Sequence, residues 1–480
     1  MRKFIFTLII IIPSHLYSQH WNVMGNIDTL QPLDGGYAVL KIINYNNNIT
    51  IGGGIKKEGN TRLSGVGQWD GTSWQPMGIG FWWGDGASID SLGAGHCFAN
   101  YNNRFYCGGT FLGAGGAAIN DSSHLSPFIT RWVGGDWNPV SPHITYFPGF
   151  NSTCTALQAY HNNLYAGGSF GISRDSSGIH STVGMARWND TVFSAVGQMA
   201  GDFPPDYDLP VLDFCIYQNK LIAGGYFTSI NGSAYGAYSG IAAWDDTNWS
   251  AFGVGFNNTV FALTVYNGEL YAGGMFTATR DNLTPLNHIA KWNGTQWQAV
   301  GEGLNDTVLA LTVDSVNNIL YAGGGFTQTG LGVQAKHLAQ WTGTNWQEVG
   351  GGTNRTVRAL FSKDGNLYVG GTFTRAGNVQ ASLIACWGYG LQVGVGSQES
   401  GVRSQELGVV PNPCASQLGI MNYELGIKEV KIYNVLGEVV KECTMDNAQL
   451  IIDISSFAKG IYFVEVKTEN KVLRNKFIKQ

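Results

Sequence analysis

Charged residues are scarce in this chain of 480 residues, at 13%. The 28 Lys and Arg stand against 33 Asp and Glu, so the net charge is −5. The chain therefore lacks the basic excess with which proteins bind nucleic acid, and no such partner is expected. Low charge beside 67 Gly and 12% aromatic residues argues against a coiled coil or a disordered chain. This composition favours an all-β repeat protein with many tight turns.

A hydrophobic run of membrane-spanning length is also missing. The apolar run Phe4–Ile12 has nine residues, too few to cross a bilayer. It follows Met1-Arg2-Lys3 and precedes a short polar stretch that ends at Ser18, which is the order of a secretory signal peptide. We expect residues 1–18 to be removed on export and no integral membrane segment to remain.

Cysteines are few and do not recur with any period. There are seven of them and no Cys-x-x-Cys pair, which argues against a thiolate zinc site. Cys97 and Cys107 occupy positions held by Ala in other repeats, so we expect small core residues there. His288 and His337 share one repeat position, which favours repeat drift over a metal pair. We predict no metal site and no cofactor.

One octet recurs through most of the chain. Leu270–Thr277 reads Leu-Tyr-Ala-Gly-Gly-Met-Phe-Thr, and six further copies of varying closeness carry the same glycine pair. Successive pairs are 47 to 59 residues apart, a period typical of propellers and other repeat arrays. Glycine inside a strand indicates close backbone approach or a bulge. The pairs begin at Gly52, Gly108, Gly167, Gly224, Gly273, Gly323 and Gly370.

A second phrase lies between the octets and carries two aromatic residues, as in residues 289–301 with Trp292 and Trp297. Each cycle therefore reads as four strands. The seventh cycle stops after Trp387 without its fourth strand, whereas residues 20–25 match that strand. We predict a seven-bladed β-propeller of four-stranded blades over residues 19–390, closed by an N-terminal strand.

The glycine pair at the end of a strand, the downstream aromatic pair and the four-strand period resemble the Kelch and galactose-oxidase type of propeller. The resemblance implies the fold. No copper ligands are marked in this sequence, so it carries over no oxidase activity.

The composition changes after the seventh cycle. Residues 391–408 are rich in Gly, Ser, Gln and Glu, which indicates a flexible linker. Residues 409–480 then read as short strands that predict a small Ig-like β-sandwich. Their Pro-Asn-Pro start, Gly-Ile-Tyr-Phe strand and Lys-Phe-Ile-Lys end closely resemble the type A C-terminal sorting domain of type IX secretion. The resemblance implies that the type IX machinery is a partner. It also implies a secreted or outer-surface protein, with the sorting domain usually removed.

The connections from strand two to three and from strand four to one open on the same face of such a propeller. They are long in the first four cycles and short afterwards. Aromatic groups beside carboxylates there suit a sugar or peptide, although packing of the loops on one another explains them equally well. We expect a binding or adhesion module for glycan or protein. The alternative is a carboxylate-dependent hydrolase or lyase, for which no catalytic residue stands out. The candidate ligand-binding residues are Trp82, Trp83, Asp85, Tyr146, Asp206, Tyr207 and Tyr235.

Overall fold

The computed structural model describes residues 19–25, 27–28, 38–83, 93–116, 121–141, 149–200, 211–388, 408–410, 417–421, 427–434, 438–444, 450–468 and 472–479. The chain divides into two compact units, residues 1–394 and 395–480. The expected signal peptide (residues 1–18) and nearly all of the expected linker lie outside the described residues. Apart from one 3-10 turn, Ser122–His124, the regular structure of the described residues consists of β-strands.

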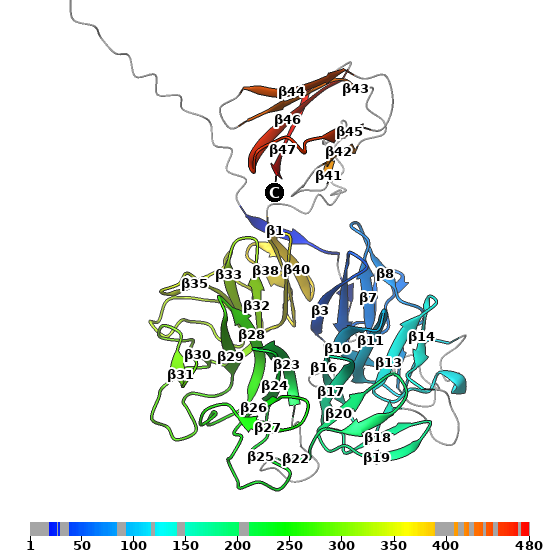
Figure 1. The fold of residues 1–480 in the computed structure, drawn as a ribbon, viewed down its shortest axis with the longest axis vertical. Helices are drawn as coiled ribbons and strands as arrows, with labels where there is room; N and C mark the ends of the chain where they lie inside the picture. The colour runs from blue at the N-terminus through cyan, green and yellow to red at the C-terminus, as the bar shows by residue number, and fades with distance from the viewer. Residues whose placement is uncertain are drawn as a thin grey trace, which may run out of the picture. The chain divides into compact units, whose positions relative to one another are not determined.

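The first unit contains seven antiparallel sheets of four strands (Figure 1). In each sheet the octet with the glycine pair forms the second strand, which pairs with the first and third strands. The first strands are β3 (Val39–Tyr45), β10 (Ala94–Tyr101), β16 (Cys154–Tyr160), β23 (Val211–Tyr217), β28 (Val260–Tyr266), β32 (Val308–Asp314) and β36 (Val357–Lys363). The second strands are β4 (Asn48–Gly53), β11 (Arg104–Thr110), β17 (Asn163–Gly168), β24 (Lys220–Gly225), β29 (Glu269–Gly274), β33 (Ile319–Gly324) and β37 (Asn366–Gly371).

The aromatic phrase supplies the third and fourth strands. The third strands are β7 (Val66–Trp69), β13 (Ile129–Val133), β20 (Met185–Trp188), β26 (Ile241–Trp244), β30 (Ile289–Trp292), β34 (Leu338–Trp341) and β40 (Ile384–Gly388). The fourth strands are β8 (Trp74–Pro76), β14 (Asp136–Pro139), β21 (Phe193–Ala195), β27 (Trp249–Ala251), β31 (Trp297–Ala299), β35 (Trp346–Glu348) and β1 (His20–Val23).

The N-terminal strand completes the last sheet, as the sequence predicts. Trp21 of β1 lies opposite Trp387 of β40 in antiparallel register. The first strands of successive sheets contact one another in chain order, and β36 contacts β3, so the series closes on itself. The seven sheets therefore form a propeller-like, all-β arrangement whose first and last sheets are neighbours.

The glycine pairs allow the sheets to approach each other. A Cβ atom placed on the first glycine of each pair would lie 2.4–2.9 Å from an atom of the first strand of the next sheet. For Gly273 that atom is Val308 Cγ1 at 2.5 Å, and for Gly370 it is Val39 Cγ1 at 2.5 Å, across the closure. Real Cβ atoms are not found so close to such atoms, so each pair marks a tight contact between sheets.

Tryptophans hold neighbouring sheets together. In six of the seven sheets the fourth-strand Trp donates its indole N–H to a backbone carbonyl of the preceding sheet. The Trp346 Nε1–Val300 O distance is 3.0 Å, and the Trp21 Nε1–Gly350 O distance is 2.7 Å. Trp74, Trp137 and Trp297 are at most 2% exposed, and each packs against the aromatic residue of the third strand. These three tryptophans are therefore core residues of the first unit.

Short extra sheets lie in the connections that follow the second and fourth strands. One joins β9 (Phe81–Trp82) to β12 (Gly113–Ala114), and another joins β22 (Met199–Ala200) to β25 (Ser229–Ile230). The others contain β2 (Ile27–Asp28), β5 (Lys57–Glu58) and β6 (Thr61–Arg62); β15 (Gly149–Phe150), β18 (Ile172–Asp175) and β19 (Gly178–Ser181); and β38 (Arg375–Ala376) with β39 (Val379–Gln380).

The second unit contains two sheets. One has the order β41 (Gly408–Val410), β42 (Gln417–Met421) and β45 (Leu450–Asp453). The other has the order β44 (Val439–Thr444), β43 (Ile427–Tyr433), β46 (Gly460–Thr468) and β47 (Val472–Lys479). Val430, Ile432, Val464 and Val466 are fully buried, so the four-stranded sheet has one apolar face.

Candidate functional site

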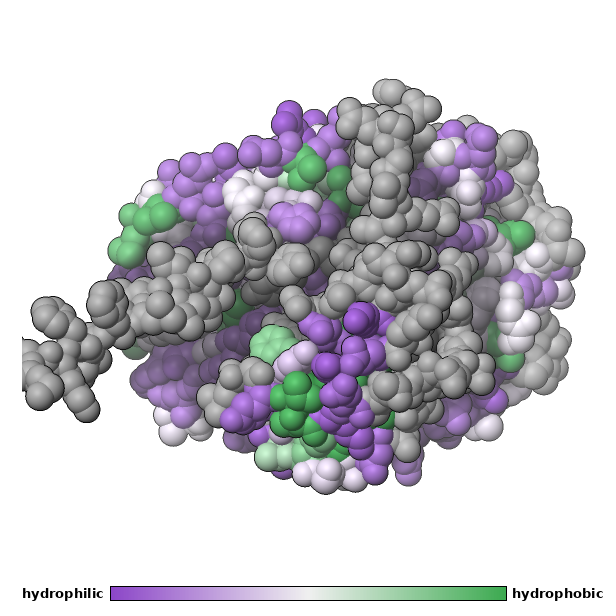
Figure 2. Space-filling model, turned by 90° about the horizontal axis from the view of Figure 1, so that it is seen from above, coloured by the Kyte–Doolittle hydropathy of each residue, from purple (hydrophilic) through white to green (hydrophobic). Residues whose placement is uncertain are grey.

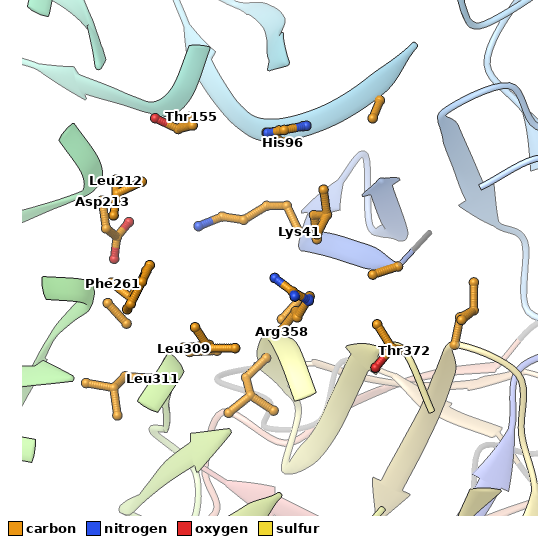
Figure 3. Close-up of a pocket in the computed structure, with 18 of the residues that line it drawn as sticks. Lys41, His96, Thr155, Leu212, Asp213, Phe261, Leu309, Leu311, Arg358 and Thr372 are labelled. Atoms are coloured by element: carbon orange, nitrogen blue, oxygen red, sulfur yellow. The ribbon is translucent and has the colours of Figure 1, made fainter. Parts of the chain in front are cut away.

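Every first strand of the seven sheets carries a β-bulge near its start. The pairing register with the second strand shifts by one residue at the same place in each sheet. A bulge leaves one residue unpaired and turns its side chain away from the ladder. All seven unpaired residues line one cavity of about 860 Å³ (Figure 3). They are Leu40, His96, Thr155, Leu212, Phe261, Leu309 and Arg358.

The cavity lies at one end of the ring of first strands. The bulges are at the beginning of these strands, where the connections from strand four enter. Arg355, just before β36, and Thr372 and Thr374, just after β37, also line the cavity. The cavity therefore opens at the end of the sheets where the longer connections of the first four cycles lie.

Two charged side chains lie in the repeat position directly after the bulge, Lys41 in β3 and Asp213 in β23. Figure 3 shows Lys41 extending across the cavity toward Asp213, with Arg358 projecting from β36 beside the stem of Lys41. The Lys41 ammonium and the Asp213 carboxylate do not form an ion pair, because their nitrogen and oxygen atoms are more than 4.0 Å apart. The same position holds Cys97, Ala156, Ala262, Ala310 and Ala359 in the other five sheets.

Asp213 is held in an unfavourable place for a carboxylate. Burial raises the pKa of Asp213, while the positive charge of Lys41 and the hydrogen bond from the Leu263 N–H act in the opposite direction. The Leu263 N–Asp213 Oδ2 distance is 2.9 Å. The side chain still touches the cavity. Asp213 is therefore an accessible acceptor whose ionised form is poorly solvated.

His96 lines the cavity as a neutral group at neutral pH. Burial lowers the pKa of His96 to about 4. Its Nε2 lies 3.2 Å from Thr110 Oγ1, which in turn lies 3.2 Å from Thr153 Oγ1. The positive charge of the described cavity lining therefore comes from Lys41, Arg355 and Arg358 and not from the imidazole.

Three of the seven predicted ligand-binding residues fall on described positions. The Trp82 side chain is 2% exposed and packs in the interior, so it offers no surface to a ligand. Trp83 is 39% exposed and contacts the Phe128 ring edge-on, with ring centroids 5.6 Å apart. Tyr235 is 65% exposed and lies 4.6 Å from the Arg280 guanidinium. The other four lie outside the described residues: Asp85, Tyr146, Asp206 and Tyr207.

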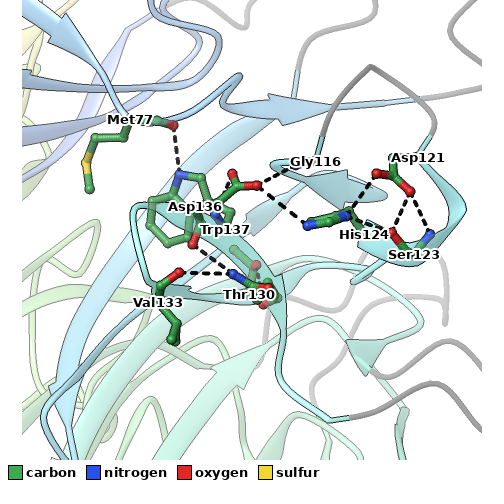
Figure 4. A network of polar contacts seen from close by, with 10 residues as sticks. Met77, Gly116, Asp121, Ser123, His124, Thr130, Val133, Asp136 and Trp137 are labelled. Atoms are coloured by element: carbon green, nitrogen blue, oxygen red, sulfur yellow. Dashed lines mark hydrogen bonds and ion pairs between the residues drawn. The ribbon is translucent and has the colours of Figure 1, made fainter.

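A polar network organises the connection after β11 (Figure 4). His124 lies between two carboxylates, with its Nδ1 3.2 Å from Asp121 Oδ2 and its Nε2 3.6 Å from Asp136 Oδ2. Asp136 Oδ2 also accepts the Gly116 N–H at 2.9 Å. Ser123 donates to Asp121 and neighbours His124 in sequence, so the group fastens a loop. Ser123 Oγ also lies 2.9 Å from His124 Nδ1, so a serine, a histidine and a carboxylate are in contact here, although the same hydroxyl donates to Asp121 Oδ1.

His288 and His337 occupy the same repeat position and have the same unusual backbone conformation. Their φ angles are 70° and 63°, and the same position in the other sheets also has positive φ, including at Phe128 and Leu383. Its carbonyl accepts the N–H of the second glycine of the pair, as in Gly274 N–His288 O at 3.0 Å. Among the described residues, no group of three His, Cys, Asp or Glu side chains is placed to hold a metal.

The described surface offers no large apolar patch on the face shown in Figure 2. Hydrophobic residues form small separate areas among hydrophilic ones in that view. Such scattered residues are ordinary on a protein surface. Within the described ranges, no helix is long and apolar enough to cross a membrane.

Sequence reasoning missed the cavity residues, although one signal for them was present. Lys41 and Asp213 are charged at a position that holds Ala or Cys in the other five cycles, and this departure is visible once the repeats are aligned. The bulge is not visible in that way. It depends on the register between two strands, which the repeat pattern does not specify.

Comparison with solved structures finds distant likenesses. One is described as the extracellular domain of a hybrid two-component system from B. thetaiotaomicron, with 11% identity and a TM-score of 0.48 over 95% of this chain and 52% of that one. Another is PorZ, a surface component of the type IX secretion system of Porphyromonas gingivalis, with 15% identity and a TM-score of 0.38 over 94% and 60%. The WD40 β-propeller domain of Doa1 has 12% identity and a TM-score of 0.37 over 78% and 97%. The chain spans about half the length of the first of these structures.

No curated protein matches the chain. Residues 408–480 match a family model described as the secretion system C-terminal sorting domain. This match coincides with the strands β41 to β47 of the second unit. The predicted sorting domain is thereby confirmed, and the chain carries at its C-terminus the type IX sorting domain of a secreted, cell-surface protein.

Proposed function

We propose that the chain is an exported binding module that holds a glycan or protein ligand in the central cavity of its first unit. The observation that carries the proposal is the pair Lys41 and Asp213, charged side chains in a repeat position that is otherwise small and uncharged. The fold accepts Ala at this position in four other sheets, so it has no structural need of a charge there. Partly buried charges cost stability, and ionisable groups in such places cluster at functional sites.

The connections around the cavity also support a ligand site at this end of the sheets. Trp83 and Tyr235 are exposed aromatic residues in connections at the cavity end of the sheets. We propose them, with Asp85, Tyr146, Asp206 and Tyr207, as the outer rim of the ligand site. Aromatic side chains suit such a rim because they present large rigid surfaces at low entropic cost.

The proposal includes the architecture that positions the cavity. We propose that residues 19–390 form a seven-bladed, Kelch-like propeller in which each four-stranded sheet is one blade. We also propose a signal peptide over residues 1–18 and a flexible linker over residues 391–408. The sorting domain, residues 409–480, is proposed as an Ig-like sandwich that is removed after export, leaving the propeller released or attached to the outer surface.

A carboxylate-dependent hydrolase or lyase is the alternative. The two-carboxylate mechanism of glycoside hydrolysis needs a pair of acids on opposite sides of the bond. In the described lining of the cavity Asp213 is the one carboxylate. Binding without catalysis is therefore the function that the described geometry supports better.

An array experiment tests this function. The purified full chain is applied to glycan and peptide arrays, and bound protein is detected by a label on the N-terminal side of the mature chain. We expect a small set of related ligands, and we expect Asp213→Ala to reduce the signal on all of them. A chain that binds nothing on either array, while folded by circular dichroism, contradicts the proposed function.

A further inference from the structure

The described lining of the cavity has an excess of positive charge. Lys41, Arg355 and Arg358 line it with one carboxylate, Asp213. The side chains of these three cations form no hydrogen bond or ion pair with any described residue. Unpaired cations at the mouth of a cavity attract an anionic group, and arginine forms strong bidentate hydrogen bonds with a carboxylate, as it does with a phosphate.

The charges are separated rather than clustered. Lys41 and Asp213 belong to sheets that are not neighbours in the ring, and Figure 3 shows them facing each other across the cavity. A ligand that joins them must offer an anionic group to Lys41 and Arg358 and a hydrogen-bond donor to Asp213. Both groups must be carried on one compact body that fits a volume of about 860 Å³.

The walls between the charges are apolar. Two of the bulge residues, Phe261 and Leu309, lie on the strands between Asp213 and Arg358, and Leu212 lies beside Asp213. The ligand body therefore needs an apolar face as well as polar edges. A pyranose ring has this form, because its C–H groups form an apolar face and its hydroxyls lie at the edge. Its rigidity also lowers the entropic cost of binding, whereas a peptide must be ordered.

We propose that the cavity binds a uronic acid residue of an acidic glycan. The sugar carboxylate contacts Lys41 and Arg358, ring hydroxyls donate to Asp213, and the C–H face packs against Phe261 and its apolar neighbours. Arg355, at the entrance, contacts a second uronate of the same glycan. This inference rests on the proposed binding function and specifies its ligand.

Calorimetric titration of the full chain with trigalacturonic acid, and with a neutral galactose trisaccharide, tests the inference. We expect the acidic sugar to bind and the neutral one to bind at least about tenfold more weakly. Lys41→Ala and Arg358→Ala should each weaken binding of the acidic sugar by about tenfold or more, because a charge-assisted hydrogen bond is lost. Lys41→Arg keeps the charge and should retain most of the affinity.

Lys363→Ala is the matched control. Lys363 lies on β36, as Arg358 does, but at the other end of the strand, where its Nζ contacts Asn47 Oδ1 at 2.7 Å. Its loss should leave the affinity unchanged. The melting temperature of each variant is measured beside the wild type, and Lys41→Arg reports on the site if an alanine variant fails to fold.

Three results overturn the inference. Equal affinity of wild type and Lys41→Ala for trigalacturonic acid would show that the sugar does not bind in the cavity. Preference for the neutral sugar would show that the ligand is not anionic. Failure of the acidic sugar to bind, with a peptide selected by the array instead, replaces the glycan by a peptide and leaves the proposed binding function intact. Only a chain that binds no glycan and no peptide contradicts both.

Discussion

Asp213 shows at the scale of one residue how the site differs from the scaffold around it. The repeats put Ala at its position in β16, β28, β32 and β36. The carboxylate is therefore an addition to a working structural pattern. Because burial raises its pKa, the fold is less stable with the ionised form than with an uncharged side chain.

Asp213→Ala should consequently stabilise the protein while weakening ligand binding. We expect a gain of about 1 kcal/mol in the free energy of unfolding at pH 7, typical of a substitution toward the repeat consensus. Chemical denaturation measures the gain. Asp364→Asn is the control, since that side chain is exposed and should change stability by less than about 0.5 kcal/mol. A marked loss of stability in Asp213→Ala would show that the carboxylate is structural.

His96 should make stability depend on pH. Its pKa in the folded protein is about 4, below the ordinary value of 6.5, so the unfolded chain takes up a proton in this interval and the folded chain does not. The stability that His96 provides as a neutral group is complete above pH 6.5 and falls as the pH is lowered from 6.5 toward 4. His96→Gln cannot be protonated, so its melting temperature should fall less between pH 7 and pH 4.5. Parallel curves for the two proteins would contradict the prediction.

At the scale of the strand, the glycine pairs and the tryptophans act on the same contact between neighbouring sheets. The first glycine removes the side chain that would collide with the next first strand, and the fourth-strand tryptophan reaches back to the preceding sheet. The glycine contact recurs in every sheet and the tryptophan bond in six of the seven, which is why these residues recur along the chain while the loops vary.

Gly273→Ala should destabilise the protein by about 1–3 kcal/mol, because the added Cβ would lie 2.5 Å from Val308 Cγ1. Gly171→Ala serves as the control, since a Cβ there meets no atom within 4 Å and the φ angle is an ordinary one. Equilibrium unfolding of both variants checks the difference. Equal stability of the two would mean that the sheets separate at little cost.

The strands and their pairing could be predicted from the sequence because these features repeat. The glycine pair occurs seven times and the full aromatic phrase six times, so no single chance similarity decides the prediction. The candidate site could be predicted only in part. The sequence points to the end of the sheets where the cavity lies, but the Trp82 side chain is buried, since β9, which contains it, pairs with β12. Neither that pairing nor the bulges at Leu40 and Arg358 follow from a local pattern.

At the scale of the whole molecule, closure depends on a short segment far from its partners in sequence. Trp21 packs against Trp387 with ring centroids 5.3 Å apart and donates to Gly350 O. Trp21 belongs to β1. Loss of β1 would leave β40 with an unpaired edge, and exposed edges favour aggregation.

Trp21→Ala should cost about 3–5 kcal/mol of stability, because it removes a buried ring and a hydrogen bond between sheets. Deletion of residues 19–25 should cost at least as much. Thermal unfolding measures both, with His20→Ala as the control, since His20 is on the same strand and exposed. A deletion variant that melts at the wild-type temperature would show that the ring does not need this strand.

Export of the protein should depend on the second unit, whereas folding of the first unit should not depend on it. A chain that ends before residue 409 loses the sorting domain but none of the strands β1 to β40. We expect it to remain in the periplasm with the circular dichroism of a folded β protein. Fractionation of cells that express both forms tests this, and the truncated form in the medium or on the cell surface would refute a sorting role.

The most direct test of the account is a crystal structure of the protein with the ligand that the arrays select. We predict ligand density in the central cavity, within hydrogen-bond distance of Lys41 and Asp213, with the apolar face of the ligand against Phe261. Density at the opposite end of the sheets, over the short hairpins such as Asn102-Asn103 and Asn293-Gly294, would contradict the account, and the propeller-like fold alone would remain.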